Sequence, residues 1–276
     1  MKKVVLSIAG LDPSGGAGIL ADTRAIFAFD CFPAACVTSI TFQNTQGVFG
    51  AEHVSGESLR RQILPVLDDY EVSAVKTGML PTAETIRVTA ELLSDAGISA
   101  IVVDPVVRST SGFDLIDDQA LRELIDELFP LAALITPNIP ETERITGVAI
   151  GSLEDVSEAA EILRSFGAAN ILIKGGHAIG PIGEGTNTAE RKATDYLFVG
   201  DDLFEISGEF HETTATHGTG CILSAAIAVN LALGYSLHES TKIAKSFVNE
   251  GIRNAPMLGK GFSPIGIDFI SRSAQK

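Results

Sequence analysis

Short apolar segments that suit buried strands alternate along most of this chain with longer segments of helical periodicity. The segments expected to be strands are 4–9, 34–39, 74–76, 100–103, 133–136 and 170–174. The segments expected to be helices are 17–29, 58–68, 82–96, 117–128, 140–146 and 153–166. Continuous apolar strands joined by helices are typical of a parallel sheet covered on both faces. The sequence therefore predicts an α/β fold with a central, mostly parallel sheet flanked by helices on both faces.

The last third of the chain departs from this rhythm. Residues 178–192 are rich in Gly, Thr and Asn and predict a surface loop. Residues 194–199 and 203–206 flank Gly200-Asp201-Asp202 and predict a hairpin. Two helical segments, 219–233 and 237–253, follow. Because no repeat or shift in composition divides the sequence, we expect a single domain over residues 1–276.

Charge, hydropathy and cysteine content exclude several classes of protein. The formal net charge is −15, and the sequence has no basic stripe of the kind a nucleic-acid surface needs. No apolar run reaches the roughly 18 residues of a membrane span. The three cysteines include no CxxC pair, which argues against a disulfide framework or a zinc site and favours a reducing cytoplasm.

The segment 216–221, Thr-His-Gly-Thr-Gly-Cys, directly precedes a long apolar run of helical pattern. The first N–H groups of a helix lack partners within the helix, and the helix dipole adds positive charge there. Such a junction predicts a binding site for an anion, here a phosphoryl group in transfer. We expect the main-chain N–H groups from Gly218 to Cys221, Gly220 included, to stabilise its charge.

Cys221 at this junction admits two interpretations. As a buried small residue its thiol would be inert. At a helix N-terminus its pKa should fall, and the resulting thiolate would deprotonate or orient a substrate hydroxyl.

Polar residues also stand at the ends of the expected strands, where open parallel sheets bind their ligands. Asp104 follows 100–103, and Asn138 and Glu141 follow 133–136. Asp104 and Glu141 suit the outer shell of Mg²⁺, although Glu141 would equally stabilise the start of a helix. Lys174 ends its strand and either pairs with nucleotide phosphates or extends to solvent.

A second group of polar and soft residues lies nearer the N-terminus. The glycine loop at 10–18 is either a substrate loop or a tight turn, with Asp22 one helical turn further on. Gln43, in the polar segment 41–47, offers a donor and an acceptor that suit the edge of a heterocycle, or it caps its own loop. Met79 would cover a flat ring or simply fill space.

Seven segments in order together resemble the hydroxymethylpyrimidine/phosphomethylpyrimidine kinase family of thiamine biosynthesis, within the ribokinase-like superfamily. They are 8–19, 43–48, 76–79, 104–106, 136–141, 174–177 and 217–221. The P-loop and protein-kinase signatures are absent, as this resemblance implies.

The resemblance implies ATP-dependent phosphorylation of 4-amino-5-hydroxymethyl-2-methylpyrimidine, and then of its monophosphate, in a homodimeric enzyme. It implies that Gln43 binds the aminopyrimidine beside Asp22, and that Met79 and Val106 line the ring site. In most of the superfamily the position of Cys221 holds an aspartate base, so the identity of the base stays open.

The resemblance also implies that the phosphates and Mg²⁺ are held by residues at the strand ends and at the start of the helix after 216–221. These are Asp104, Asn138, Lys174 and Thr219 for the nucleotide and Asp104 with Glu141 for the metal ion.

Two other functions remain open. One is a pyridoxal kinase of the same fold, against which Gln43 with Asn44 and Thr45 favours an aminopyrimidine. The other is a non-catalytic sensor that binds a pyrimidine, against which Lys174 and Asp104 favour a working ATP site.

Overall fold

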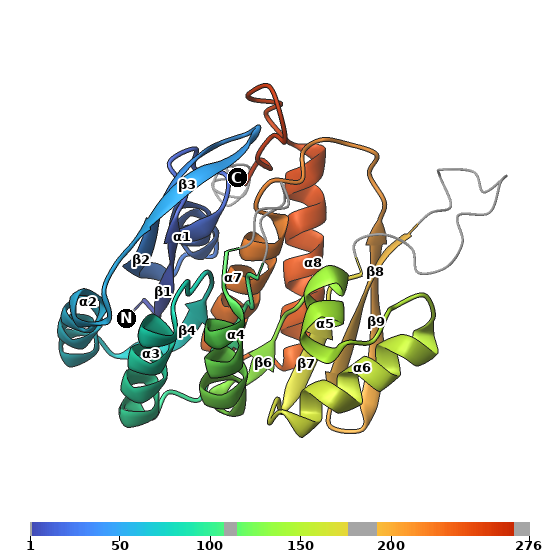
Figure 1. The fold of residues 1–276 in the computed structure, drawn as a ribbon. Coiled ribbons are helices and arrows are strands. Elements are labelled where there is room, and N and C mark those ends of the chain that lie inside the picture. Colours follow the sequence, from blue (N-terminus) through green and yellow to red (C-terminus); the bar gives the residue numbers. More distant parts are fainter. Residues whose placement is uncertain (1, 108–114, 176–191, 268–276) are drawn as a thin grey trace, which may run out of the picture.

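The computed structural model describes residues 2–107, 115–175 and 192–267, and its nine strands form one sheet (Figure 1). The strands are β1 (Val4–Leu11), β2 (Phe32–Asn44), β3 (Gly47–His53), β4 (Val72–Thr77), β5 (Ile101–Val103), β6 (Leu134–Ile135), β7 (Asn170–Ile173), β8 (Lys192–Val199) and β9 (Asp202–Glu209). Their order is β3-β2-β1-β4-β5-β6-β7-β8-β9. The strands from β2 across to β7 are parallel, and β3, β8 and β9 pair antiparallel at the two edges. The structure confirms the predicted mostly parallel sheet and the hairpin predicted near Gly200, which is formed by β8 and β9.

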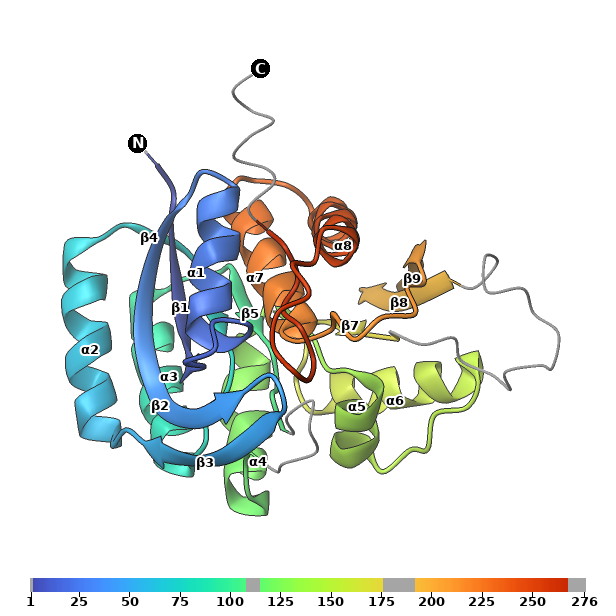
Figure 2. The same ribbon diagram turned by 90° about the horizontal axis from the view of Figure 1, so that it is seen from above.

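Helices cover both faces of this sheet, as predicted (Figure 2). The helices are α1 (Gly18–Ala28), α2 (Gly56–Asp69), α3 (Ala83–Ala96), α4 (Asp118–Glu123), α5 (Ile139–Thr146), α6 (Leu153–Ser165), α7 (Thr219–Ala232) and α8 (Leu237–Arg253). Helices α1, α7 and α8 pack on one face, and α2, α3, α4 and α6 pack on the other.

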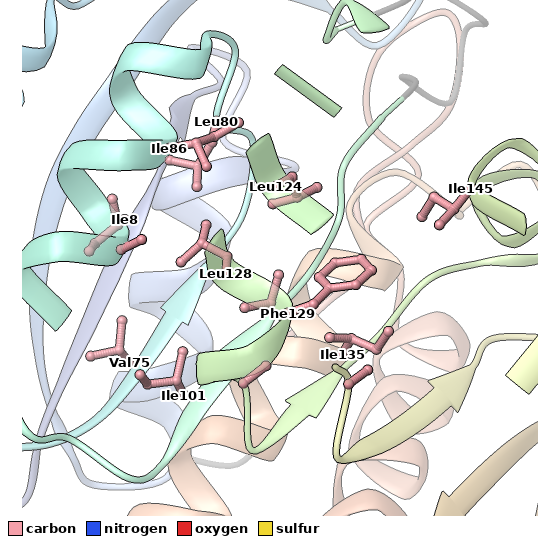
Figure 3. Close-up of a cluster of buried hydrophobic side chains, with 14 of the residues drawn as sticks. Ile8, Val75, Leu80, Ile86, Ile101, Leu124, Leu128, Phe129, Ile135 and Ile145 are labelled. Carbon is pink, nitrogen blue, oxygen red and sulfur yellow. The ribbon is translucent and has the colours of Figure 1, made fainter. Parts of the chain in front are cut away.

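The central strands are apolar throughout because both of their faces are buried. In β5, Ile101 and Val103 point into the cluster beneath α3 and α4, which Figure 3 shows with Leu128 and Phe129. Val102, between them, points to the opposite cluster beneath α7. This alternation fixes the register of each parallel strand, and with it the residues that follow the strand at the edge of the sheet.

The structure corrects the sequence prediction in the segment 41–47. These residues are not a loop: β2 continues to Asn44 and turns directly into β3. The Asn44 side chain accepts the N–H of Gln46 at 2.8 Å and so closes the turn. Thr41 and Gln43 line the cavity described below, and Phe42, between them, is exposed. Because the inward face of this hairpin meets a cavity and not the apolar core, these residues lack the alternation of apolar and polar side chains that usually predicts a strand.

A second correction concerns the helix predicted at 117–128. Regular winding ends at Glu123, and Leu124–Leu128 forms a wider π turn. Leu124, Leu128 and Phe129 are all buried there.

None of the helices in the described part of the chain is long and apolar enough to cross a membrane. The loop expected at 178–192 lies outside the described residues, except for Lys192 at the start of β8.

Candidate active site

A cavity of about 1480 Å³ opens at the carboxyl ends of the parallel strands. Its lining includes Asp12, Met79, Asp104, Asn138 and Lys174, each of which stands just beyond the end of a different strand. A pocket that holds one drug-sized ligand typically measures about 300–1,000 Å³. The cavity therefore has room for two substrates side by side.

The start of α7 forms one wall of this cavity and differs from most helix starts in the protein. A Ser, Thr, Asn or Asp side chain caps α2, α3, α4, α5, α6 and α8. In contrast, α7 begins after Gly218, whose φ is 78°, with neither a side-chain cap nor an acidic residue in the first turn. Gly218, Thr219, Gly220 and Cys221 all line the cavity. The helix start can therefore receive an anion from the cavity.

Lys174 faces this helix start from across the cavity floor. Its Nζ donates to Asp104 Oδ1 at 2.7 Å, and a Cβ added at Gly220 would lie 3.2 Å from the same Nζ. The Lys174 N–H donates to Pro137 O at 2.8 Å, which fixes the main chain after β7. The structure thus brings together Lys174, Asp104 and Gly220, as the sequence predicted from three distant segments.

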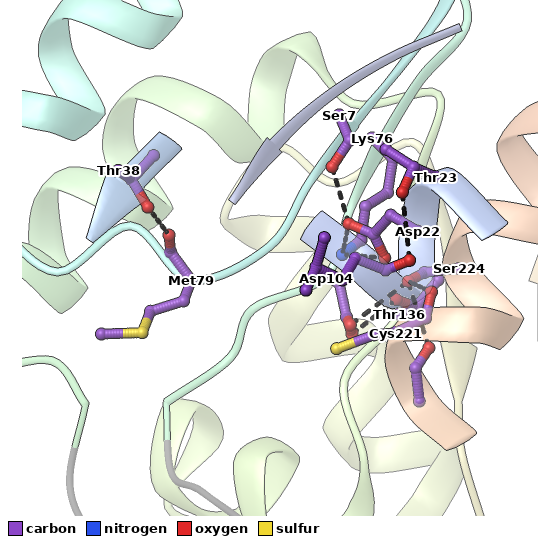
Figure 4. Close-up of polar contacts among 12 residues, drawn as sticks. Ser7, Asp22, Thr23, Thr38, Lys76, Met79, Asp104, Thr136, Cys221 and Ser224 are labelled. Carbon is purple, nitrogen blue, oxygen red and sulfur yellow. Dashed lines mark hydrogen bonds and ion pairs between the residues drawn. The ribbon is translucent and has the colours of Figure 1, made fainter. Parts of the chain in front are cut away.

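Asp104 is held by neighbours on both oxygens (Figure 4). Thr136 donates to Oδ1 at 3.0 Å and Ser224 donates to Oδ2 at 3.2 Å. Burial disfavours the charged forms of Asp104 and Lys174, but their mutual attraction, together with Lys76 near the aspartate and Glu141 near the lysine, outweighs it. The pKa of Asp104 is therefore lowered and the pKa of Lys174 is raised, so the pair is ionised at neutral pH.

Asn138 and Glu141 form a reciprocal cap at the start of α5. Asn138 Oδ1 accepts the N–H of Glu141 at 2.8 Å, and Glu141 Oε2 accepts the N–H of Asn138 at 2.9 Å. Both residues also line the cavity. Burial raises the pKa of Glu141 to about 7, with Lys174 opposing the shift and Asp104 adding to it.

The carboxylates of Asp104 and Glu141 suit Mg²⁺ in donor chemistry but do not form a complete protein cage. Among the described residues, no group of three or more His, Cys, Asp or Glu side chains is placed to hold a metal ion. Mg²⁺ commonly takes one or two carboxylates and completes its shell with water and phosphate oxygens. The residues present fit that arrangement.

The cavity lining also includes the residues expected at the heterocycle. Gln43, Met79 and Val106 are all part of the lining. The carbonyl of Met79 accepts the Thr38 hydroxyl at 2.6 Å (Figure 4), and the Met79 Sδ approaches Gly10 so closely that an added Cβ would lie 3.1 Å from it. These contacts fix Met79 against the first strand.

The structure places Asp22 otherwise than the sequence analysis expected. Its side chain is fully buried and is not part of the cavity lining. Both of its oxygens accept Lys76 Nζ, at 2.8 and 3.0 Å, and Ser7 donates to it at 2.7 Å (Figure 4). Asp22 therefore faces Lys76 and Ser7 instead of a ligand in the cavity.

Lys76 is a site residue to which the sequence analysis assigned no role. It is fully buried, yet it lines the cavity floor. Burial opposes its charge, but Asp22, Cys221 and Asp104 together outweigh burial, and the pKa of Lys76 is raised. A lysine inside the apolar strand β4 was the available signal, since a buried lysine needs a paired carboxylate.

Cys221 lies beside Asp104 in the first turn of α7 (Figure 4). Burial raises the pKa of its thiol to about 11; Lys76 acts in the other direction, and Asp104 and Asp22 reinforce the rise. The expectation of a lowered thiol pKa is wrong, because burial and two nearby carboxylates together outweigh the opposing effect of Lys76. The thiol is protonated at neutral pH.

Asp12 and His217 are further residues whose roles the sequence analysis did not identify. His217 Nε2 lies 2.8 Å from Asp12 Oδ2. The contact joins the loop after β1 to the segment before α7. Both residues line the cavity, so the two loops meet at its wall.

The comparisons with known proteins agree with this geometry. Residues 12–266 match the model of a family described as phosphomethylpyrimidine kinase. This chain belongs to the phosphomethylpyrimidine kinase family. The hydroxymethylpyrimidine/phosphomethylpyrimidine kinase of Rhizobium meliloti is 42% identical to it over 268 residues, which are 96% of this chain and 97% of that protein.

Two solved structures to which this chain is similar have the expected fold. A phosphomethylpyrimidine kinase from Clostridium difficile is 37% identical, with a TM-score of 0.77 over 91% of this chain and 100% of that chain. A Bacillus subtilis pyridoxal kinase, solved as an ADP complex, is 29% identical, with a TM-score of 0.85 over 99% of this chain and 100% of that chain. The predicted ribokinase-like fold is confirmed.

Proposed function

We propose that this phosphomethylpyrimidine kinase family member phosphorylates 4-amino-5-hydroxymethyl-2-methylpyrimidine with ATP. It then phosphorylates the monophosphate to the diphosphate for thiamine biosynthesis. One observation carries the proposal: the ionised Lys174–Asp104 pair faces an uncapped helix start inside a cavity that also exposes Gln43.

ATP binds with its triphosphate between Lys174 and the start of α7. The pyridoxal kinase of Bacillus subtilis, which has the same fold, was solved with ADP. Lys174 supplies a point charge to the phosphates, and Asn138 and Thr219 stand beside it at the cavity wall. The N–H groups from Gly218 to Cys221 then stabilise the charge that spreads over the γ-phosphoryl oxygens during transfer.

Asp104 and Glu141 are the carboxylates that would hold Mg²⁺, together with phosphate and water oxygens. When bound, the ion neutralises charge on the β- and γ-phosphates. Asp104 also keeps Lys174 in place, since the Lys174 ammonium donates to it. Glu141 contributes from the rigid start of α5, where its own side chain closes the cap.

The pyrimidine binds at the opposite end of the cavity. Gln43 offers one N–H donor and one carbonyl acceptor, which match an exocyclic amino group and the adjacent ring nitrogen. Met79 and Val106 cover the ring. This placement directs the hydroxymethyl oxygen toward the start of α7.

Transfer forms a bond from the hydroxymethyl oxygen to the γ-phosphorus and breaks the bond to the β-phosphate oxygen. The hydroxyl proton leaves to the transferred phosphoryl group. A loose transition state of this kind needs positioning and electrostatic stabilisation more than a strong base. A protonated Cys221 therefore serves by orienting the hydroxyl.

Pyridoxal kinase is the second candidate, because the pyridoxal kinase structures match this fold over nearly the whole chain. A competition assay with equal concentrations of the pyrimidine and pyridoxal, ATP and Mg²⁺ separates the two. We expect the pyrimidine phosphates to form first and to dominate. Preferential formation of pyridoxal phosphate would reject the first candidate, and tight pyrimidine binding without ADP formation would reveal a sensor.

Two further expectations accompany this function. We propose that two copies of the chain associate, because Ile40, Phe42 and Phe49 of the β2–β3 hairpin are 45–69% exposed. Sedimentation would show a dimer, and a monomer at micromolar concentration would contradict it.

We also propose that the chain forms a single domain. We propose further that the protein works in a reducing cytoplasm, where its three free cysteines would remain thiols.

A further inference from the structure

Asp12 gathers hydrogen bonds from two separate segments of the chain. Its Oδ1 accepts the N–H and the hydroxyl of Ser14, at 2.8 and 2.7 Å. Its Oδ2 accepts the N–H of Ala17 at 2.8 Å and meets His217 Nε2 at 2.8 Å. The first three bonds shape the loop before α1, and the fourth reaches the segment before α7.

The chemistry of the pair fixes the direction of the contact with His217. Burial disfavours ionised Asp12, but hydrogen bonds from His217 and Ser14 outweigh it and lower the pKa of Asp12 to about 2. An ionised carboxylate only accepts, so His217 donates from Nε2. The imidazole is thereby held in one orientation.

His217 is also confined by the glycines around it. A Cβ at Gly16 would overlap the His217 ring, and a Cβ at Gly218 would overlap the carbonyl oxygen of Gly16. The His217 N–H donates to Ser263 O at 3.2 Å. The loop after β1 and the residues before α7 therefore interlock, and His217 directly precedes Gly218–Cys221, which line the cavity.

We propose that Asp12 and His217 are positioning residues that hold the main-chain N–H groups of Gly218–Cys221 at the γ-phosphoryl site. The inference rests on the proposed phosphoryl transfer and adds two residues to it. Neither side chain touches the transferred group; both act through the main chain of the following residues. Donors that stabilise a transition state lose much of their effect when displaced by about 1 Å.

The same pair links the two ends of the cavity. Gln43 also acts on the Asp12 carboxylate and lowers its pKa. Thr45, two residues further on, accepts the N–H of Phe262 at 2.7 Å, and the neighbouring Ser263 accepts from His217. The heterocycle end and the anion end are therefore built on one connected group of loops.

The variants that test this proposal are His217→Gln, His217→Met and Gly16→Ala. Glutamine keeps a donor at about the distance of Nε2, whereas methionine has a similar length and no donor. Gly16→Ala removes no polar group but pushes the ring away from Asp12. Ser14→Ala is the matched control, since it removes the Ser14 hydroxyl, which donates to Asp12 and lies 3.5 Å from His217 Nε2, and keeps the shorter 2.8 Å contact between His217 and Asp12.

Turnover of the pyrimidine is the first readout, beside thermal unfolding of each variant. We expect kcat to fall at least about 10-fold in His217→Met and Gly16→Ala. His217→Gln should recover most of the loss, and Ser14→Ala should stay close to the parent. Parental kcat in both His217→Met and Gly16→Ala would overturn the proposal, as would a loss in His217→Met that glutamine does not reduce.

Calorimetric binding of AMP-PCP and ADP is the second readout and does not require the acceptor to be known. His217→Met should weaken AMP-PCP, which carries a γ-group, and leave the Kd for ADP within about 2-fold. Equal weakening of both ligands would show a merely structural role and would overturn the proposal. If the parent binds AMP-PCP more tightly than ADP but does not phosphorylate the pyrimidine, the proposed function fails while this readout still decides the role of His217.

Discussion

Lys174 and Gly220 face each other across the cavity floor, with the lysine Nζ 3.2 Å from where a Cβ on the glycine would lie. They are 46 positions apart in the sequence; Lys174 directly follows β7, and Gly220 lies in the first turn of α7. The absence of a side chain at Gly220 lets the ammonium group approach the main chain of the first turn of α7 closely. An anion bound at this point would meet the charge of Lys174 and the main-chain donors of α7 together.

Replacing Gly220 by alanine should push Lys174 away from the start of α7. We expect kcat to fall about 10- to 100-fold, because the new methyl group displaces Lys174 or the phosphoryl group it faces. Unfolding in urea should change little, since alanine favours the helix. Cys31→Ala is the control: Cys31 is buried in the core beneath α1, and its loss should leave kcat unchanged. Equal kcat in both variants would contradict the assigned site.

Replacing Lys76 by methionine should destabilise the protein by about 3–5 kcal/mol, because Asp22, whose pKa burial already raises, would be left buried without the partner that holds its charge. The double variant Lys76→Met with Asp22→Asn removes both charges. It should recover at least half of the loss in the free energy of unfolding measured in urea. Additive losses in the double variant would show that the two side chains do not depend on each other.

The Cys221 thiol should react slowly at neutral pH. Since its pKa is about 11, the rate of alkylation by iodoacetamide should rise about tenfold per pH unit from pH 7 to pH 10. Cys31 and Cys36 are buried, so Cys221→Ser should abolish labelling of the folded protein. Cys221→Ser should also keep kcat within about tenfold of the parent. A labelling rate that levels off below pH 8 would restore the thiolate as a candidate base.

Asp12 should contribute to stability in a defined range of pH. Its folded-state pKa of about 2 lies below its usual value of 3.8, so the native protein binds this proton less tightly than the unfolded chain. The contribution is present above pH 4 and is lost as the pH falls toward 2, and its size is about 2 kcal/mol. The stability difference between the parent and Asp12→Asn in urea should therefore shrink by about that amount from pH 7 to pH 2. A constant difference would contradict the lowered pKa.

Much of the fold and part of the site were predictable from sequence. Apolar segments followed by polar or glycine-rich residues repeat along the chain and predict parallel strands. Because the carboxyl ends of parallel strands meet at one edge of the sheet, Asp104, Asn138 and Lys174 could be placed together there. The start of α7 was recognisable because small residues precede an apolar helix. These features depend on local pattern and on a general rule of sheet topology.

What sequence could not give is the pairing of charges across the fold. The sequence predicted that Asp22 would line the cavity. Its partner Lys76 lies 54 positions away, and the ion pair with Lys76 holds the Asp22 side chain in the core. Asp12 and His217 are 205 positions apart, so no local pattern joins them. The pKa of Cys221 likewise depends on burial and on carboxylates from α1 and from the end of β5, which together outweigh the opposing effect of Lys76.

The position of the γ-phosphoryl group tests the central claim most directly. A crystal structure with AMP-PCP, Mg²⁺ and the hydroxymethylpyrimidine should place γ-phosphoryl oxygens about 2.7–3.1 Å from N–H groups of the Gly218–Cys221 segment, with Lys174 on the opposite side. The hydroxymethyl oxygen should point at the same phosphorus. A triphosphate bound away from α7, with Lys174 still paired only to Asp104, would contradict the account.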